Sequence, residues 1–107
     1  ALYTSHEGLL LDYETCLTRV GKEADVAKAY YSMSAHYLWI GERTNKLGEA
    51  HLEYFRGISN PIGVKCGPNT SAEEMANILQ ILNPRNELGK VVLITRFGAA
   101  NVQAKLP

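Results

Sequence analysis

Apolar residues recur at two different intervals along the chain, and the first segment has the spacing of a helix. Between residues 9 and 20 they return every three to four positions, which places them on one helical face. Just before this segment, Thr4 and Glu7 fit a capping box, in which two side chains satisfy free backbone N–H groups of the first turn. The pattern predicts a helix that stops at Gly21, followed over residues 22–28 by a polar surface excursion or a loose helix.

Three short segments farther along are almost continuously apolar and have the length of strands. They span residues 36–40, 61–66 and 90–95, and a glycine follows each of them within three residues. Uninterrupted apolar strands are typical of parallel sheets, in which both faces are buried. The sequence therefore predicts three buried parallel strands.

Helical patterns separate these strands. One covers residues 45–58, and a second opens at Ser71 and Glu74, which form another capping box. Pro84 ends the second helix because proline cannot continue the backbone hydrogen bonds. A short last helix is expected over residues 99–106.

The order β-α-β-α-β predicts the α/β class, with a parallel sheet covered on both faces and right-handed crossovers. We expect a single partial domain over residues 1–107, with a helical lead-in over 1–33 and three βα units over 34–107. Three parallel strands alone leave two open edges. We therefore expect them to form part of a larger sheet or a barrel.

Composition narrows the class of protein without indicating a function. The 107 residues are 46% hydrophobic and 21% charged, as in an ordinary soluble domain. Eleven basic and eleven acidic residues give a net charge of zero, which argues against binding nucleic acid through bulk charge. No apolar run approaches the roughly 18 residues of a membrane helix, and no secretory signal is visible. Because the chain opens without Met, we expect a processed product or a piece of a longer protein.

Charged residues follow the predicted strands at the ends where parallel α/β folds bind ligands. Glu42 and Arg43 follow the first strand, Lys65 lies near the end of the second and Arg96 follows the third. If the strands are parallel, the three cations converge at one edge, with Glu42 beside them. Such a cluster fits a phosphorylated carboxylic acid, because arginine offers a planar fork and lysine a compact charge. The alternative is that these are solvated charges in ordinary turns.

Lys65 is the most informative of these charged residues, because it lies inside an otherwise apolar strand. A buried lysine is costly unless it points into a polar cavity or is paired. Alternation along the strand places Lys65 on the opposite face from Val64 and Cys66. The competing explanation is an edge-strand lysine that protects against aggregation.

The cysteines and histidines form no metal or disulfide pattern. Cys16 and Cys66 are too few for a disulfide scaffold, and we expect two reduced thiols. Cys66 either has a pKa lowered by its neighbour Lys65 or is buried behind its strand. We expect His36 to be hydrogen-bonded near a strand start. The three histidines form neither HxxxH nor HExxH, so we assign no metal site to this chain; they are His6, His36 and His51.

Several longer motifs are distributed along the chain, in residues 4–7, 10–14, 34–44, 60–68, 82–86 and 95–98. They include Gly-Glu-Arg-Thr at 41–44 and Asn-Pro-Ile-Gly-Val-Lys at 60–65. These motifs resemble those of the class II (plant-type) 3-deoxy-D-arabino-heptulosonate-7-phosphate (DAHP) synthases. The resemblance covers essentially the whole chain.

The resemblance implies a TIM barrel that condenses phosphoenolpyruvate with erythrose 4-phosphate and releases phosphate, the first step of the shikimate pathway. This chain is similar to the middle of that barrel, about strands three to five. The family's phosphoenolpyruvate site is matched here by Glu42, Arg43, Lys65 and Arg96. The two arginines would hold the phosphate. Lys65 would pair with the carboxylate and deliver a proton, and Glu42 would orient the cations or a water.

The resemblance also implies parts that this chain lacks. The family's divalent metal, Mn²⁺ or Co²⁺, is held by ligands from the first, sixth, seventh and eighth strands, and neither Cys16 nor Cys66 matches them. A phosphoenolpyruvate arginine on the second strand and most of the erythrose 4-phosphate site are missing too. We expect a fragment with little or no activity alone.

The expected partners are the two small-molecule substrates, without nucleic acid or membrane. The full-length enzyme is expected to be a homo-oligomer in the cytoplasm, or in the plastid of a plant. Two other functions remain open from the residues: a non-catalytic α/β regulatory module that binds phosphate or another anion, and a purely structural piece.

Overall fold

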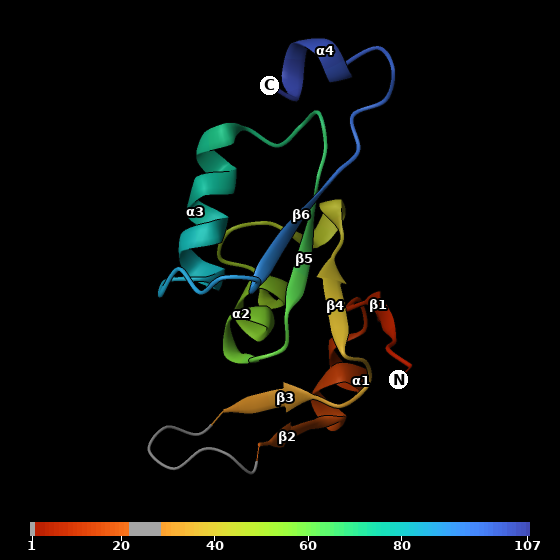
Figure 1. Ribbon diagram of the computed structural model, residues 1–107, viewed down its shortest axis with the longest axis vertical. Coiled ribbons are helices and arrows are strands. Elements are labelled where there is room, and N and C mark those ends of the chain that lie inside the picture. Colours follow the sequence, from red (N-terminus) through yellow and green to blue (C-terminus); the bar gives the residue numbers. More distant parts are fainter. Residues whose placement is uncertain (1, 22–28) are drawn as a thin grey trace.

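The central element is a four-stranded parallel sheet with the order β1-β4-β5-β6, seen in a computed structural model that describes residues 2–21 and 29–107 (Figure 1). Its strands are β1 (Ser5–Glu7), β4 (Tyr37–Ile40), β5 (Ile62–Cys66) and β6 (Val91–Thr95). The last three are the predicted strands, each shorter at its start by one residue. The alternation of parallel strands and helices confirms the α/β class.

Two helices connect the parallel strands. α2 (Ala50–Gly57) follows β4, and α3 (Ala72–Leu82) follows β5. The Ser71 side chain accepts a hydrogen bond from the Glu74 N–H at 3.1 Å, which confirms this predicted cap. A short 3-10 helix, η1 (Glu42–Thr44), follows β4, and α2 begins five residues later than predicted.

The remaining helices are short. α1 (Leu11–Cys16) follows β1, and α4 (Val102–Lys105) replaces the longer helix expected over residues 99–106. No helix in the described ranges is long and apolar enough to span a membrane.

The hydrophobic core lies between the sheet and the helices α2 and α3. Leu38, Ile40, Ile62 and Val64 point into it from the sheet and are fully buried. Phe55 fills the space under α2 and is fully buried as well. These contacts explain why the two helices lie side by side on the same side of the sheet (Figure 1).

The prediction that helices cover both faces of the sheet is wrong for the described part of the chain. On the face opposite the core, Trp39 and Lys65 are half-buried and Val92 is exposed. Among the described residues, β1 and β6 also have only one strand neighbour each. An apolar strand pattern predicts burial of both faces, but it cannot tell which part of a polypeptide provides the cover.

The predicted helical lead-in is largely wrong. Residues 5–7 form strand β1 beside β4, so Thr4 and Glu7 are not a helix cap. The helix is limited to α1, and after it β2 (Thr18–Val20) pairs antiparallel with an unpredicted strand, β3 (Tyr30–Ser32). Backbone pairing with neighbouring strands outweighs the local helical pattern here. The predicted polar stretch over residues 22–28 lies outside the described residues.

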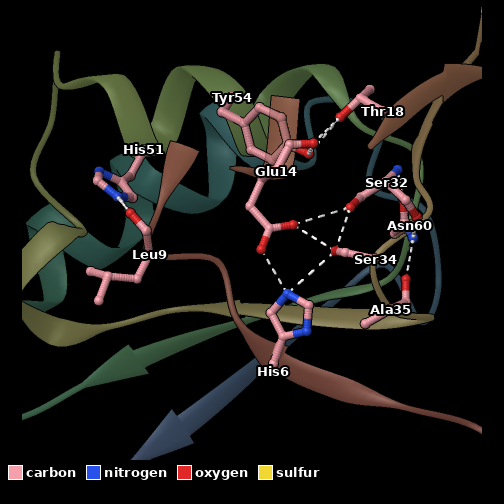
Figure 2. Close-up of polar contacts among 10 residues, drawn as sticks. All are labelled: His6, Leu9, Glu14, Thr18, Ser32, Ser34, Ala35, His51, Tyr54 and Asn60. Atoms are coloured by element: carbon pink, nitrogen blue, oxygen red, sulfur yellow. Dashed lines mark hydrogen bonds and ion pairs between the residues drawn. The ribbon is translucent and has the colours of Figure 1, made fainter. Parts of the chain in front are cut away.

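A buried carboxylate joins these N-terminal elements (Figure 2). Glu14 on α1 is 2% exposed and accepts a 2.6 Å hydrogen bond from the Ser34 hydroxyl. The Ser32 hydroxyl on β3 donates to the same oxygen at 3.4 Å, and the other carboxylate oxygen lies 2.7 Å from Nε2 of His6 on β1. Because buried charge is stable only when it is paired, this cluster fixes α1 and β3 against β1.

A second polar cluster holds the amino ends of the strands. Asn60 is buried, accepts a hydrogen bond from the Ser32 N–H and donates to the carbonyls of Ser32 and Ala35. The ammonium of Lys90 donates to the carbonyls of Ile58 and Asn60. Burial lowers the pKa of Lys90. β3 and the starts of β5 and β6 are thereby joined at the end of the sheet that lies away from the charged residues.

Candidate functional site

A cavity of about 290 Å³ lies at the carboxyl ends of the strands, and the four predicted site residues line it. This volume is near the lower limit of ligand pockets, about 300 Å³. The predicted convergence of the charged side chains is therefore confirmed, although their binding roles stay predictions. The lining residues are Glu7, Leu9, Gly41, Glu42, Arg43, Thr44, Lys65, Cys66 and Arg96.

The η1 turn brings Glu42 and Arg43 to the cavity. β4 ends at Ile40, and the chain then turns at once, because the Thr44 N–H donates to the Gly41 carbonyl at 3.1 Å. The Thr44 hydroxyl reaches the same carbonyl at 3.3 Å. A single closed turn thus carries the two charged residues over the end of the sheet.

Lys65 extends from the centre of the sheet. β5 lies between β4 and β6, so the explanation of Lys65 as an edge-strand lysine is wrong. Val64 and Cys66 point into the core, as the alternation predicted, and Lys65 points to the other face. Its ammonium lies 5.5 Å from the ring centroid of Trp39, within the range of a cation–π contact.

Arg96 is held beside Lys65 by backbone pairing. Its N–H donates to the Cys66 carbonyl at 3.0 Å, so β6 stays joined to β5 one residue beyond the end of the strand. The three cations therefore come from three successive strand ends of one sheet, β4, β5 and β6.

Glu7 is a site residue that the sequence reasoning missed. It ends β1 and lies across the end of β4, where its Oε1 atom would be 2.7 Å from a Cβ atom placed on Gly41. Glu42 lies in the same way over the next strand end, because a Cβ atom at Gly67 would collide with its carboxylate. Both glycines thus make room for a carboxylate. In the sequence, Glu7 is an acidic residue followed by Gly8, but the spacing of Thr4 and Glu7 predicts a helix cap there instead.

The cations of the cavity have no carboxylate partner in direct contact. Within residues 2–21 and 29–107, the ion pairs closer than 4 Å are His6–Glu14 and Arg56–Glu53, and both lie outside the cavity. Three cationic side chains and two carboxylates line the cavity, so the net charge of its lining is positive. Unpaired guanidinium groups and an ammonium can form strong charge-assisted hydrogen bonds to phosphate and carboxylate groups.

The thiol of Cys66 is buried and not activated. Burial raises its pKa, and the nearby charge of Glu42 raises it further. The alternative of a pKa lowered by Lys65 is therefore wrong, and burial behind the strand is confirmed. Both Cys66 and the exposed Cys16 are free thiols, as expected.

The histidines lie outside the cavity lining. Nδ1 of His36 accepts a hydrogen bond from the Thr4 N–H at 3.1 Å, which confirms the predicted bonding near a strand start. His51 on α2 contacts the Leu9 carbonyl at 2.7 Å (Figure 2). Throughout the described ranges, no three His, Cys, Asp or Glu side chains form a group that could hold a metal ion. The residues of this site therefore do not fit the divalent metal that the resemblance implies.

Comparisons with known proteins agree on one family. The family model described as "Class-II DAHP synthetase family" matches residues 1–107. The chain is 52% identical over 117 residues to a phospho-2-dehydro-3-deoxyheptonate aldolase of Neurospora crassa, covering 99% of the chain and 24% of that protein. It is 47% identical over 105 residues to a probable chloroplastic phospho-2-dehydro-3-deoxyheptonate aldolase of Catharanthus roseus, covering 98% and 21%.

A bacterial relative gives the same result. The phospho-2-dehydro-3-deoxyheptonate aldolase of Streptomyces coelicolor is 47% identical over 105 residues, which cover 98% of the chain and 23% of that protein. The chain thus spans less than a quarter of the length of each of these three relatives. Since the family model matches every residue of the chain, the chain belongs to the class-II DAHP synthetase family.

Proposed function

We propose that this chain supplies the phosphoenolpyruvate-binding part of a DAHP synthase active site. The complete enzyme would condense phosphoenolpyruvate with erythrose 4-phosphate to DAHP and phosphate, at the start of the shikimate pathway. The observation that carries the proposal is the convergence of three cations from successive parallel strand ends on one cavity. Membership of an enzyme family favours this function over a non-catalytic regulatory module.

The charges of the cavity suit a small substrate with a phosphate and a carboxylate. Arg43 and Arg96 would hold the phosphate, since guanidinium groups form paired hydrogen bonds to its oxygens. Lys65 would bind the carboxylate and deliver a proton to the substrate. Glu42, which lies over Gly67, would orient the cations or a water.

The rest of the site would come from outside these residues. β4, β5 and β6 would be about strands three to five of a TIM barrel, a fold that places its active site at the carboxyl ends of the strands. The remaining strands would cover the open face of the sheet. They would also provide the ligands of a divalent metal and most of the erythrose 4-phosphate site.

The proposal predicts the effect of removing one cation at a time from the complete enzyme. Lys65→Ala and Arg96→Ala should each raise the KM for phosphoenolpyruvate and lower kcat, because each removes a charge-assisted contact worth about 1.5–3 kcal/mol. That loss corresponds to roughly a tenfold to hundredfold fall in kcat/KM. Steady-state kinetics with both substrates measures the change.

Arg85→Ala is the matched control. Arg85 is exposed and lines a different cavity, together with Lys90, so its removal takes away one surface charge without touching the site. Its kinetic constants should equal those of the wild type. Unchanged kinetics for both Lys65→Ala and Arg96→Ala would refute the proposed roles.

A further inference from the structure

Asn45 is a buried polar residue directly behind the η1 turn. Its side chain is only 3% exposed, and its Nδ2 donates a 3.0 Å hydrogen bond to the backbone carbonyl of Lys65. Asn45 does not line the cavity. The bond nevertheless joins the two backbone segments that carry the cavity's charged side chains, the η1 turn and the end of β5.

The bond is formed where the strand pairing ends. β4 pairs with β5 only as far as Ile40 and Val64, because the chain then leaves the sheet to form η1. On its other side, β5 stays paired with β6 through Cys66. The Asn45 amide therefore contacts the next residue of β5, Lys65, at a point where β4 no longer runs beside it.

A second contact shows how closely the turn approaches β5. The carboxylate of Glu42, at the start of η1, occupies the space of a Cβ atom on Gly67, just beyond the end of β5. Asn45, just after η1, is bonded to the same strand end at Lys65. The turn thus lies close to the end of β5 at Glu42 and is hydrogen-bonded to β5 through Asn45, and Arg43 lies between these two points.

We propose that Asn45 is a positioning residue that fixes the Glu42–Arg43 turn relative to Lys65. The affinity for phosphoenolpyruvate then depends on a side chain that does not touch it. This inference rests on the proposed function, since the substrate is the one proposed above. Its physical basis is that positioned groups lose effectiveness steeply when they are displaced.

Two substitutions remove the donor in different ways. Asn45→Asp keeps the shape and replaces the amide with an acceptor, and Asn45→Leu removes the polar group without adding charge. In the complete enzyme, each should raise the KM for phosphoenolpyruvate, lowering kcat/KM by about tenfold to a hundredfold. The KM for erythrose 4-phosphate should stay within about twofold, because a local displacement does not reach a substrate bound mostly by other segments.

Asn83 offers a matched control at the opposite end of the sheet. Its Nδ2 also donates a 3.0 Å hydrogen bond to a backbone carbonyl, that of Glu87, where α3 ends. Asn83→Asp and Asn83→Leu should leave both KM values unchanged. Equal rises of both KM values in the Asn45 variants would overturn the inference, because they would indicate general loosening. A fall in kcat/KM confined to Asn45→Asp would also overturn the inference, because the added negative charge would then be its cause.

Amide hydrogen exchange separates a failure of this inference from a failure of the proposed function. Exchange at residues 42–45 should accelerate in both Asn45 variants and not in the Asn83 variants. If the wild-type enzyme forms no DAHP, the proposed function is wrong, and the exchange result alone decides whether Asn45 holds the turn. Unchanged exchange at residues 42–45 overturns the inference whatever the activity.

Discussion

At the scale of single residues, the site depends on two glycines as much as on its charged side chains. Gly41 and Gly67 leave space for the carboxylates of Glu7 and Glu42. Neither glycine has the positive φ that would itself demand glycine, so its role is steric. Each carboxylate can therefore lie across the end of the neighbouring strand.

Gly67→Ala should impair the enzyme without unfolding it. The added Cβ atom would displace the Glu42 carboxylate, which is the far end of a flexible side chain, so the cost in stability is small. Because the displaced carboxylate is the one proposed to orient the cations or a water, kcat/KM for phosphoenolpyruvate should fall about tenfold. Steady-state kinetics and thermal unfolding of the complete enzyme check both parts.

Gly57→Ala serves as the comparison, because a Cβ atom there meets no atom within 4 Å. It should leave the kinetics unchanged and should not lower the unfolding temperature, since alanine is favoured over glycine in a helix. If Gly67→Ala behaved in the same way, the position of Glu42 would not matter to the reaction.

At the scale of elements, the strands that are predictable from sequence are those with an apolar pattern of their own. β4, β5 and β6 were predicted because continuous apolar residues mark them. β1 consists of the polar residues Ser-His-Glu and is a strand only because it pairs with β4. β3 likewise depends on its partner β2.

The site residues that the sequence predicts are those at the ends of the predicted strands. Glu42, Arg43, Lys65 and Arg96 follow or end recognised strands, so their convergence followed from a parallel sheet. Glu7 ends the unrecognised strand and was missed with it. The contact of Asn45 with Lys65 depends on how far one strand continues beyond its neighbour, which no residue pattern records.

The buried cluster around Glu14 predicts that the contact of α1 with β1 and β3 is sensitive to substitution. Glu14→Gln should destabilise the chain by about 1–3 kcal/mol, because an amide donor would face the donating hydroxyls of Ser32 and Ser34. Urea unfolding of the 107-residue chain, followed by circular dichroism, measures the change.

Glu53→Gln is the control for this substitution, since Glu53 is exposed and pairs with Arg56 on the surface. It should change the unfolding midpoint little, as is usual for exposed ion pairs. Equal midpoints for the Glu14 and Glu53 variants would contradict the structural role of the buried cluster.

At the scale of the whole molecule, the described chain is one layer of helices on an open sheet. Its radius of gyration is 14.5 Å, above the about 13 Å of a compact domain of about 100 residues. One face of the sheet is open, and β1 and β6 each have a free edge in the ranges described. In the proposed barrel, the remaining strands would cover this face and pair with these edges.

The open sheet predicts that the 107-residue chain alone does not turn over substrate. It provides the cations of one cavity, but within the described residues no group that could hold a metal ion. Incubation with phosphoenolpyruvate, erythrose 4-phosphate and Mn²⁺ should yield no DAHP above background. Robust product formation would show that the remaining strands of the proposed barrel are not needed.

The position of Lys65 over Trp39 has an optical consequence. Trp39 is the only tryptophan of the chain, and its indole lies 5.5 Å from the ammonium expected to bind the substrate carboxylate. When an anion draws that ammonium away or neutralises it, the electric field at the ring changes, and fluorescence intensity and emission maximum should follow. Titration of the chain with phosphoenolpyruvate should give a saturable change in tryptophan fluorescence. Lys65→Ala should abolish this change, and Arg85→Ala should retain it. The chain thus contains its own label for ligand occupancy.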